Sequence, residues 1–122
     1  MDTNNVALAE KYYTLLGRKN VEGIKKCLHP DVELHSPLAT VKGKEAVVKA
    51  ASNFSNVIKS LTIRAKFGSG DQAVIISDSD IPGVVGSFPT ASLLSFCDEL
   101  IVKIELFYDG GRMVEKKKEV VS

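Results

Sequence analysis

Two carboxylates at the end of one apolar segment are the residues that most strongly indicate chemistry. The segment AVIISDSDI (73–81) begins with apolar residues and ends with Asp78 and Asp80. Residues two apart in a strand share a face, so both side chains would point to the same side of a sheet. If that side faces a pocket, like charges raise the pKa of one acid and create an acid and base pair. If the strand instead emerges into solvent before Pro82, both are surface residues.

His35 is the second candidate for proton transfer. An imidazole ionises near neutral pH and can act as a general base at the mouth of a pocket. His35 lies in DVELHSP (31–37), where Val32 and Leu34 alternate with Glu33 and His35. Alternation places the imidazole on the face opposite the apolar residues, so a surface or interface position is the competing interpretation.

Hydroxyl groups among apolar residues indicate a binding pocket. Thr90 and Ser92 share a strand face with Phe88, and could line an otherwise apolar cavity. Tyr12 and Tyr108 could each donate a hydrogen bond to a ligand oxygen, or could be core tyrosines with the hydroxyl at the rim.

The spacing of glycines and cysteines argues against several kinds of chemistry. Gly68 and Gly70 join two expected strands rather than opening a helix, so they form no phosphate-binding loop. Cys27 and Cys97 lack metal-ligand spacing, and neither has an evident histidine partner. We therefore expect no metal or other cofactor, and two reduced thiols in or near the core.

Length and charge favour one domain with no nucleic-acid or membrane partner. The chain has 122 residues, 44% hydrophobic and 25% charged, which is enough to bury a core without a disulfide or metal. The 16 basic and 15 acidic residues leave a net charge of +1, which gives no electrostatic reason to expect such partners. The N-terminal sequence differs from a secretory signal, and no apolar run reaches the ~20 residues that span a bilayer. We expect a cytoplasmic protein.

Helical spacing dominates the first half of the chain and strand patterns dominate the second. The sequence predicts helices over 3–17, over 20–27 with Asn20 as cap, and over 44–58. A short strand is expected over 31–37, and four more over 61–68, 73–81, 85–96 and 100–108. The turns between the last four strands are too short for parallel connections, so these strands are antiparallel.

This order of elements predicts an α+β domain. Three N-terminal helices would pack on a strongly curved antiparallel sheet that encloses a pocket at its concave end. We expect residues 1–114 to form this single domain. The charged sequence EKKKEVVS (115–122) is expected to be a solvated tail.

Four segments resemble the nuclear-transport-factor-2-like (NTF2-like) superfamily, and within it the SnoaL-like polyketide cyclase branch. They are Y-x-x-L-L-x-x-x-N-V-E-G-I, D-V-E-L-H-S-P, S-D-I-P-G-V-V-G and I-E-L-F-Y-D, and the resemblance runs from about residue 6 to residue 112. It implies a cystatin-like cone with a deep apolar pocket, often a homodimer through the outer face of the sheet. The cone hosts isomerases, cyclases, epoxide hydrolases, dehydratases and binding modules, so the resemblance is specific for the fold and not for an activity.

The resemblance also implies roles for individual residues. In ketosteroid isomerase an aspartate base removes a proton, and a tyrosine and a protonated aspartate stabilise the oxyanion. By resemblance the tyrosine is Tyr12, the base falls on Ser36 beside His35, and the second donor falls near Ser92. A serine without a partner base cannot take that proton, so steroid isomerisation by this mechanism is not expected. The polyketide cyclase branch uses pocket acids, which makes Asp80 the preferred acid–base residue.

The last expected strand divides into two faces. By resemblance Ile104, Leu106 and Tyr108 occupy pocket-facing positions, whereas Glu105 and Phe107 point to the other side. A lone buried carboxylate is costly, so Glu105 is expected to pair with a lysine or to face a dimer partner. The complete predicted pocket is Tyr12, Ser36, Asp78, Phe88, Thr90, Ser92, Ile104, Leu106 and Tyr108.

Two hypotheses for function follow. In the first, the protein binds a small apolar or oxygenated molecule and catalyses a cofactor-free isomerisation, cyclisation or dehydration, with His35 or Asp80 as base. In the second, it is a non-catalytic ligand-binding or dimerisation module. The strand face that carries Asp78 and Asp80 distinguishes them. Acids inside the cavity favour an enzyme, and a cavity of apolar walls and hydroxyls favours a binding module.

Overall fold

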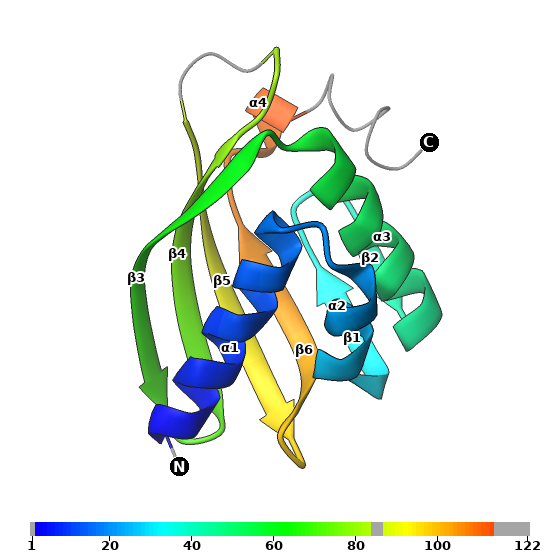
Figure 1. Ribbon diagram of the computed structural model, residues 1–122, viewed down its shortest axis with the longest axis vertical. Coiled ribbons are helices and arrows are strands. Elements are labelled where there is room, and N and C mark those ends of the chain that lie inside the picture. Colours follow the sequence, from blue (N-terminus) through cyan, green and yellow to red (C-terminus); the bar gives the residue numbers. More distant parts are fainter. Residues whose placement is uncertain (1, 84–86, 114–122) are drawn as a thin grey trace.

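Helices and a six-stranded sheet form two layers in the computed structural model, which describes residues 2–83 and 87–113 (Figure 1). The elements are α1 (Asp2–Gly17), α2 (Val21–Cys27), β1 (Leu28–His35), β2 (Thr40–Lys42), α3 (Lys44–Val57), β3 (Ser60–Ser69), β4 (Gln72–Asp80), β5 (Phe88–Cys97), β6 (Leu100–Phe107) and the single turn α4 (Gly110–Met113). Helices α1, α2 and α3 all lie on one side of the sheet. The predicted α+β class is confirmed.

The strand order is β2-β1-β6-β5-β4-β3. Strands β3 to β6 form the predicted antiparallel meander. Strand β1 lies parallel to β6, so the sheet is mixed rather than wholly antiparallel. The 64 residues from Ser36 to Glu99 between these two strands make a parallel connection possible, because such a crossover needs a dozen or more. As a result, the end of the first strand lies beside the end of the last.

Strand β2 is the one strand that the sequence pattern did not predict. It has three residues and pairs with β1 across a turn, in which the Ser36 amide donates to the Ala39 carbonyl at 2.9 Å. Three residues are too few to show an alternating pattern. Of the other predictions, positions 85–86 and the tail at 115–122 lie outside the described residues.

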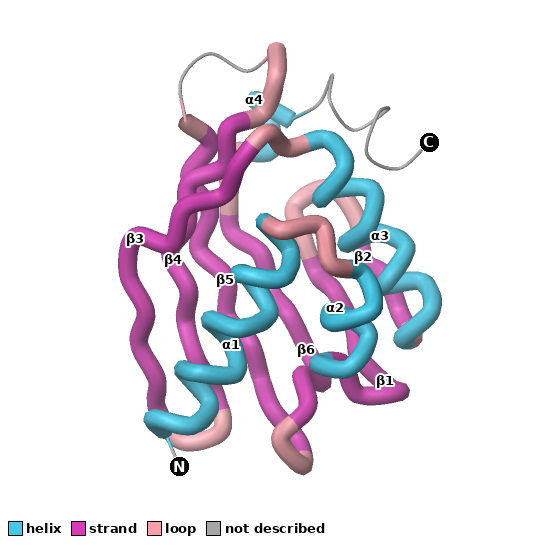
Figure 2. Tube along the Cα trace, viewed as in Figure 1, coloured by secondary structure: helices cyan, strands magenta, loops and turns pink. Residues whose placement is uncertain are grey.

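Irregular pairing bends the sheet around α1. The ladder shifts register in β3 between Ile63 and Ala65, and in β5 paired with β6 between Ser95 and Phe96. Such bulges bend a strand and increase its twist. Figure 2 shows β3, β4 and β5 curving around the helix layer, which makes one face of the sheet concave. We call the opposite side the outer face.

Alternation along the strands places the core on the concave face. Buried residues of β4, β5 and β6 pack against buried residues of α1 and α3; they include Ala73, Ile75, Leu94, Phe96, Ile101 and Ile104 from the sheet and Ala9, Tyr12, Tyr13, Leu16, Val47 and Ala51 from the helices. A smaller cluster of Ile58, Ile81 and Phe88 packs with Leu38 and Tyr108 at one end of the sheet. Among the described residues, no helix is long and apolar enough to cross a membrane.

One buried and two partly buried hydrogen bonds join the end of α1 and the residues after it to the end of α3. The Ser55 hydroxyl donates to the Leu16 carbonyl at 2.8 Å. The Lys19 ammonium donates to the Ser55 carbonyl and, at 2.9 Å, to the Ile58 carbonyl. Carbonyls in the last turn of a helix lack partners within the helix, and a cation there is favourable. These contacts fix the two helices relative to each other.

We expect Ser55→Ala to lower the free energy of unfolding by about 1 kcal/mol, because it removes a buried hydrogen bond and leaves the Leu16 carbonyl with only the Lys19 amide as donor, at 3.2 Å. Ser52→Ala is the matched control, since Ser52 is half-buried on the same helix and makes no side-chain hydrogen bond among the described residues. Urea denaturation of both variants checks this. Equal losses in the two variants would show that the hydrogen bond contributes nothing.

Candidate functional site

A cavity of about 130 Å³ lies between the helices and the concave face of the sheet. Leu16 of α1 and Ala50, Ala51 and Phe54 of α3 form its helix wall. Strands β1, β4, β5 and β6 form the opposite wall, and the turn after β1 lies at one end. The two alanines of α3 leave the space that larger side chains would fill.

Seven of the nine predicted pocket residues line this cavity. They are Tyr12, Ser36, Phe88, Thr90, Ile104, Leu106 and Tyr108. On β6, the predicted division of faces also holds, since Phe107 is 57% exposed and Glu105 lies 3.5 Å from the Lys103 ammonium. Their part in binding a ligand stays a prediction.

The predicted position of Asp78 and Asp80 in the cavity is wrong. Strand β4 buries its odd-numbered residues, Ala73 to Ser79, against the helices. The even-numbered carboxylates therefore lie on the outer face, where the Asp78 carboxylate is 3.5 Å from the Arg64 guanidinium and Asp80 is exposed. Neither acid can reach a molecule in the cavity.

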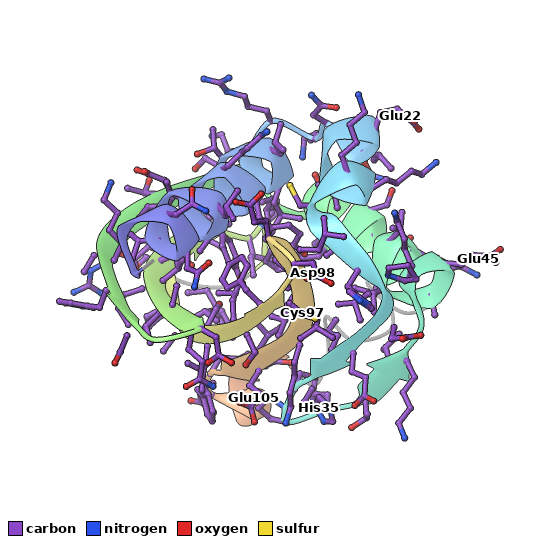
Figure 3. The ribbon with its side chains drawn as sticks, turned by 90° about the horizontal axis from the view of Figure 1, so that it is seen from below. Glu22, His35, Glu45, Cys97, Asp98 and Glu105 are labelled. Carbon is purple, nitrogen blue, oxygen red and sulfur yellow. The ribbon has the colours of Figure 1, made fainter. Side chains whose placement is uncertain are left out.

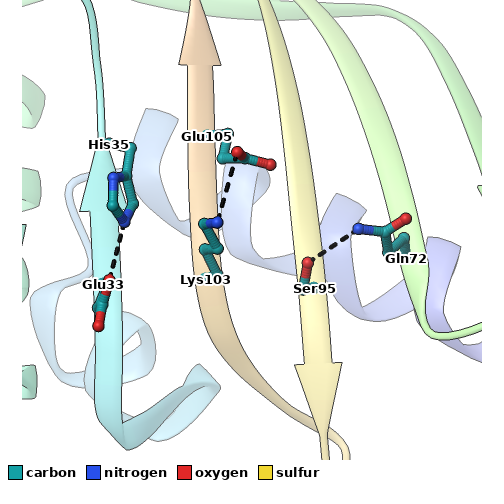
Figure 4. Close-up of polar contacts among 6 residues, drawn as sticks. All are labelled: Glu33, His35, Gln72, Ser95, Lys103 and Glu105. Carbon is teal, nitrogen blue, oxygen red and sulfur yellow. Dashed lines mark hydrogen bonds and ion pairs between the residues drawn. The ribbon is translucent and has the colours of Figure 1, made fainter.

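His35 also lies outside the cavity, in agreement with the alternative prediction of a surface or interface position. Its Nε2 lies 2.8 Å from a carboxylate oxygen of Glu33 on the outer face (Figure 4). Figure 3 shows His35 and Glu105 on the side of the sheet away from the helices. The hydrogen bond from His35, more than the nearby lysines, holds the pKa of Glu33 below its ordinary value. The expected position of His35 at the pocket mouth is therefore wrong.

Ser92 is the last predicted pocket residue that does not line the cavity. It is fully buried, and its hydroxyl accepts a hydrogen bond of 2.6 Å from the Tyr13 hydroxyl. This bond ties α1 to β5. Tyr13 lines the cavity and Ser92 does not, so the Ser92 hydroxyl contributes by holding the Tyr13 hydroxyl.

Sequence reasoning missed three lining residues with hydroxyls: Tyr13, Ser77 and Ser79. The two serines alternate with Asp78 and Asp80, so a shift of one position exchanged the hydroxyls for the carboxylates. The start of β4 gave no signal for the correct face, because Ala73 to Ile76 are all apolar and both faces look alike.

The two neighbouring tyrosines of α1 are hydrogen-bond donors. Tyr12 and Tyr13 are each 4% exposed, and their rings meet edge to face with centroids 5.1 Å apart. Burial raises the pKa of Tyr12, and the nearby Tyr13 and Cys27 raise it further. Burial also raises the pKa of Tyr13 to about 12, although the hydrogen bond to Ser92 opposes this. Both phenols therefore keep their protons at neutral pH.

The polar groups that line the cavity are hydroxyls. Among the described residues, none of the lining side chains is Asp, Glu, His, Lys or Arg. The same part of the chain contains no group of three His, Cys, Asp or Glu residues that could hold a metal ion. Removal of a carbon-bound proton needs a positioned base, and the lining side chains provide only apolar surface and hydroxyl groups.

We expect stability to fall in alkali as the unfolded tyrosines ionise. A folded-state pKa above the unfolded value of about 10 means that Tyr13 stabilises fully below pH 10 and loses this contribution as pH rises toward 12. Raising the pH from 9 to 11 should lower the free energy of unfolding by about 1 kcal/mol through ionisation of Tyr13 alone. Urea denaturation at both pH values measures this, and Tyr13→Phe should show a smaller decrease. An equal decrease in the variant would contradict the assignment.

Comparison with known proteins identifies the fold and the family. A profile of the SnoaL-like domain matches residues 9–104. No curated protein matches this chain. Three solved structures share its architecture at low identity, so they show the fold alone.

A steroid delta-isomerase from Pseudomonas aeruginosa has 19% identity and a TM-score of 0.77, over 99% of this chain and 96% of that one. An uncharacterised protein with a cystatin-like fold from Silicibacter pomeroyi has 13% identity and a TM-score of 0.83, over 95% and 84%. A de novo designed protein with a curved β-sheet has 18% identity and a TM-score of 0.85, over 98% and 95%. With its family profile spanning most of the chain, the protein belongs to the SnoaL-like domain family of the NTF2-like superfamily.

Proposed function

We propose that this protein binds a small apolar molecule bearing oxygen atoms in the cavity, and that it does not catalyse proton transfer on it. The observation that carries the proposal is the composition of the cavity wall. Its polar side chains are hydroxyls, and the candidate acids and the histidine lie on the outer face.

The helix wall supports an apolar ligand. Leu16 and Ala51 are buried in the core, and Phe54 packs against it. A ligand that covers these side chains removes apolar surface from water, which favours binding by about 25 cal/mol for each Å². Pockets of this kind combine apolar walls with a few polar groups that orient the ligand.

The position that corresponds to the base of ketosteroid isomerase is engaged in a turn. The Ser36 hydroxyl donates to the Ala39 carbonyl at 3.2 Å and accepts from the amides of Leu38 and Ala39, at 3.4 and 3.2 Å. A serine in this arrangement stabilises the turn. The similarity to a steroid delta-isomerase is therefore one of fold, and the engaged Ser36 hydroxyl argues against a shared reaction.

We expect Ala50→Leu to weaken ligand binding at least tenfold, because the larger side chain fills the cavity. Ala46→Leu is the control, since Ala46 is exposed on the same helix. Binding is measured by NMR titration with a library of one- and two-ring alcohols, ketones and esters. Failure of every compound to bind the wild-type protein would refute the proposal.

We expect no catalysed exchange of carbon-bound hydrogen in the bound ketones. NMR in D₂O measures the exchange rate with and without protein, and the two rates should agree. An accelerated exchange that is lost in His35→Gln or Asp80→Asn would support the enzyme hypothesis instead, since it would require these residues to reach the ligand.

We also propose that the outer face of the sheet binds a second copy of the chain. Phe67 and Phe107 are 61% and 57% exposed there, and half-buried Ile76 and Leu93 lie on the strands between them. Several charged groups on this face form pairs of opposite sign, including Lys103 with Glu105 and Arg64 with Asp78. A second copy related by a two-fold axis would then cover apolar area without net repulsion.

Sedimentation should give twice the chain mass of 13.2 kDa at micromolar concentration. Phe107→Glu places a carboxylate on the proposed interface and should produce monomers. Asp98→Lys is the control, since Asp98 lies in the β5–β6 turn at the end of the sheet (Figure 3). A monomeric wild-type protein would overturn this proposal and leave the ligand-binding proposal unaffected.

A further inference from the structure

Three hydroxyls on the sheet wall of the cavity form a polar strip. Ser77 and Ser79 project from β4 and Thr90 from β5, and all three line the cavity. Ser77 is the direct register partner of Thr90, and Ser79 is the next residue on the same face of β4. We call these three residues the hydroxyl strip.

The strip has no hydrogen-bond partners among the described residues, although Ser77 and Ser79 are only 1% and 2% exposed. Two other serines with the same degree of burial are paired. Ser92 accepts from Tyr13 at 2.6 Å, and Ser55 donates to a carbonyl at 2.8 Å. Among the described residues, the one fully enclosed side-chain N or O atom without a partner is Asp78 Oδ1, so the Ser77 and Ser79 hydroxyls open onto the cavity. Polar groups inside native proteins normally have partners, and the contents of the cavity can supply them here. The unpaired hydroxyls are concentrated where a ligand would lie.

The charge of the lining residues limits the ligand to uncharged molecules. No cationic or anionic side chain of the described residues lines the cavity. An ion would lose its hydration there without meeting an opposite charge, which is strongly unfavourable. A neutral hydroxyl or carbonyl group would instead replace its hydrogen bonds to water with hydrogen bonds to the hydroxyl strip.

The cavity volume limits the buried part of the ligand to about one ring. Its size of about 130 Å³ is close to that of an engineered apolar cavity of about 150 Å³ that binds benzene. The apolar wall formed by Leu16, Ala51 and Phe54 faces the sheet and can cover the faces of such a ring.

We infer that the ligand presents a neutral, ring-sized group with a hydroxyl or carbonyl oxygen on one edge, and that the hydroxyl strip binds this oxygen. Directly opposite residues in a sheet have Cβ atoms about 5 Å apart, so one oxygen can contact both Ser77 and Thr90. Ser79 is about 7 Å further along the strand and would reach a second oxygen. The inference rests on the proposed function and specifies its ligand class.

Three ligands with the same ring test it. Phenol, toluene and benzoate are titrated against the isotope-labelled protein at pH 7 and followed by NMR. Phenol should bind and benzoate should not. Ser77→Ala should weaken phenol binding about three- to tenfold and leave toluene binding unchanged, because only phenol uses the lost hydroxyl. Ser95→Ala, on the outer face of β5, should change neither affinity.

The outcomes separate this inference from the proposed function. An equal effect of Ser77→Ala on phenol and toluene, or no effect on either, would overturn the role of the strip while binding itself stands. Benzoate binding as tightly as phenol would overturn the limit to neutral ligands. Absence of binding by all three, together with failure of the wider library, would overturn both.

Stability provides a test that needs no ligand. Ser77→Ala should change the Tm of the free protein by less than about 2 °C, because the Ser77 hydroxyl opens onto the cavity and makes no hydrogen bond within the described residues. Ser92→Ala should lower the Tm, because it leaves the Tyr13 hydroxyl unpaired. A decrease of the same size in Ser77→Ala would show that the Ser77 hydroxyl is part of the folded framework, and would contradict the inference.

Discussion

Side-chain alternation along β4 decides which chemical groups the cavity contains. Ile75 is fully buried against the helices, and the two-residue period of a strand carries Ser77 and Ser79 to the same side. Asp78 and Asp80 are thereby directed outward. A slip of one residue would bury both carboxylates, which is strongly unfavourable, whereas the apolar start of the strand would only exchange Ala73 and Ile75 for Val74 and Ile76. The packing of the core therefore sets the polarity of the site.

The bend of the sheet and the hydrogen bonds between the ends of α1 and α3 keep the concave face open to a ligand. The bulges curve the sheet around the helix layer, and the small residues Ala50 and Ala51 of α3 line the cavity between helix and sheet. The Ser55 hydroxyl and the Lys19 ammonium hold the ends of the two helices together at the side of the cavity. The cavity therefore stays open between helices and sheet. Its walls are apolar except for hydroxyls.

Much of the fold could be predicted from the sequence, because helical and strand periods are clear over most of the chain. The faces of β1 and β6 were also predictable, since Glu33, His35 and Glu105 alternate with apolar residues. Strand β4 differs because it begins with four consecutive apolar residues and ends with alternating Ser and Asp. Neither half shows which face is buried. Asp78 and Asp80 were therefore assigned to the cavity face, which instead carries the neighbouring Ser77 and Ser79.

The central claim is that a ligand binds at the hydroxyl-lined concave face and not at the charged outer face. Nuclear Overhauser contacts between bound phenol and the protein's methyl groups test it most directly. The account predicts contacts to methyls of Leu16, Ala51 and Leu106, which line the cavity. Contacts to methyls of Ile76 and Leu93 on the outer face, with none to the cavity residues, would contradict it.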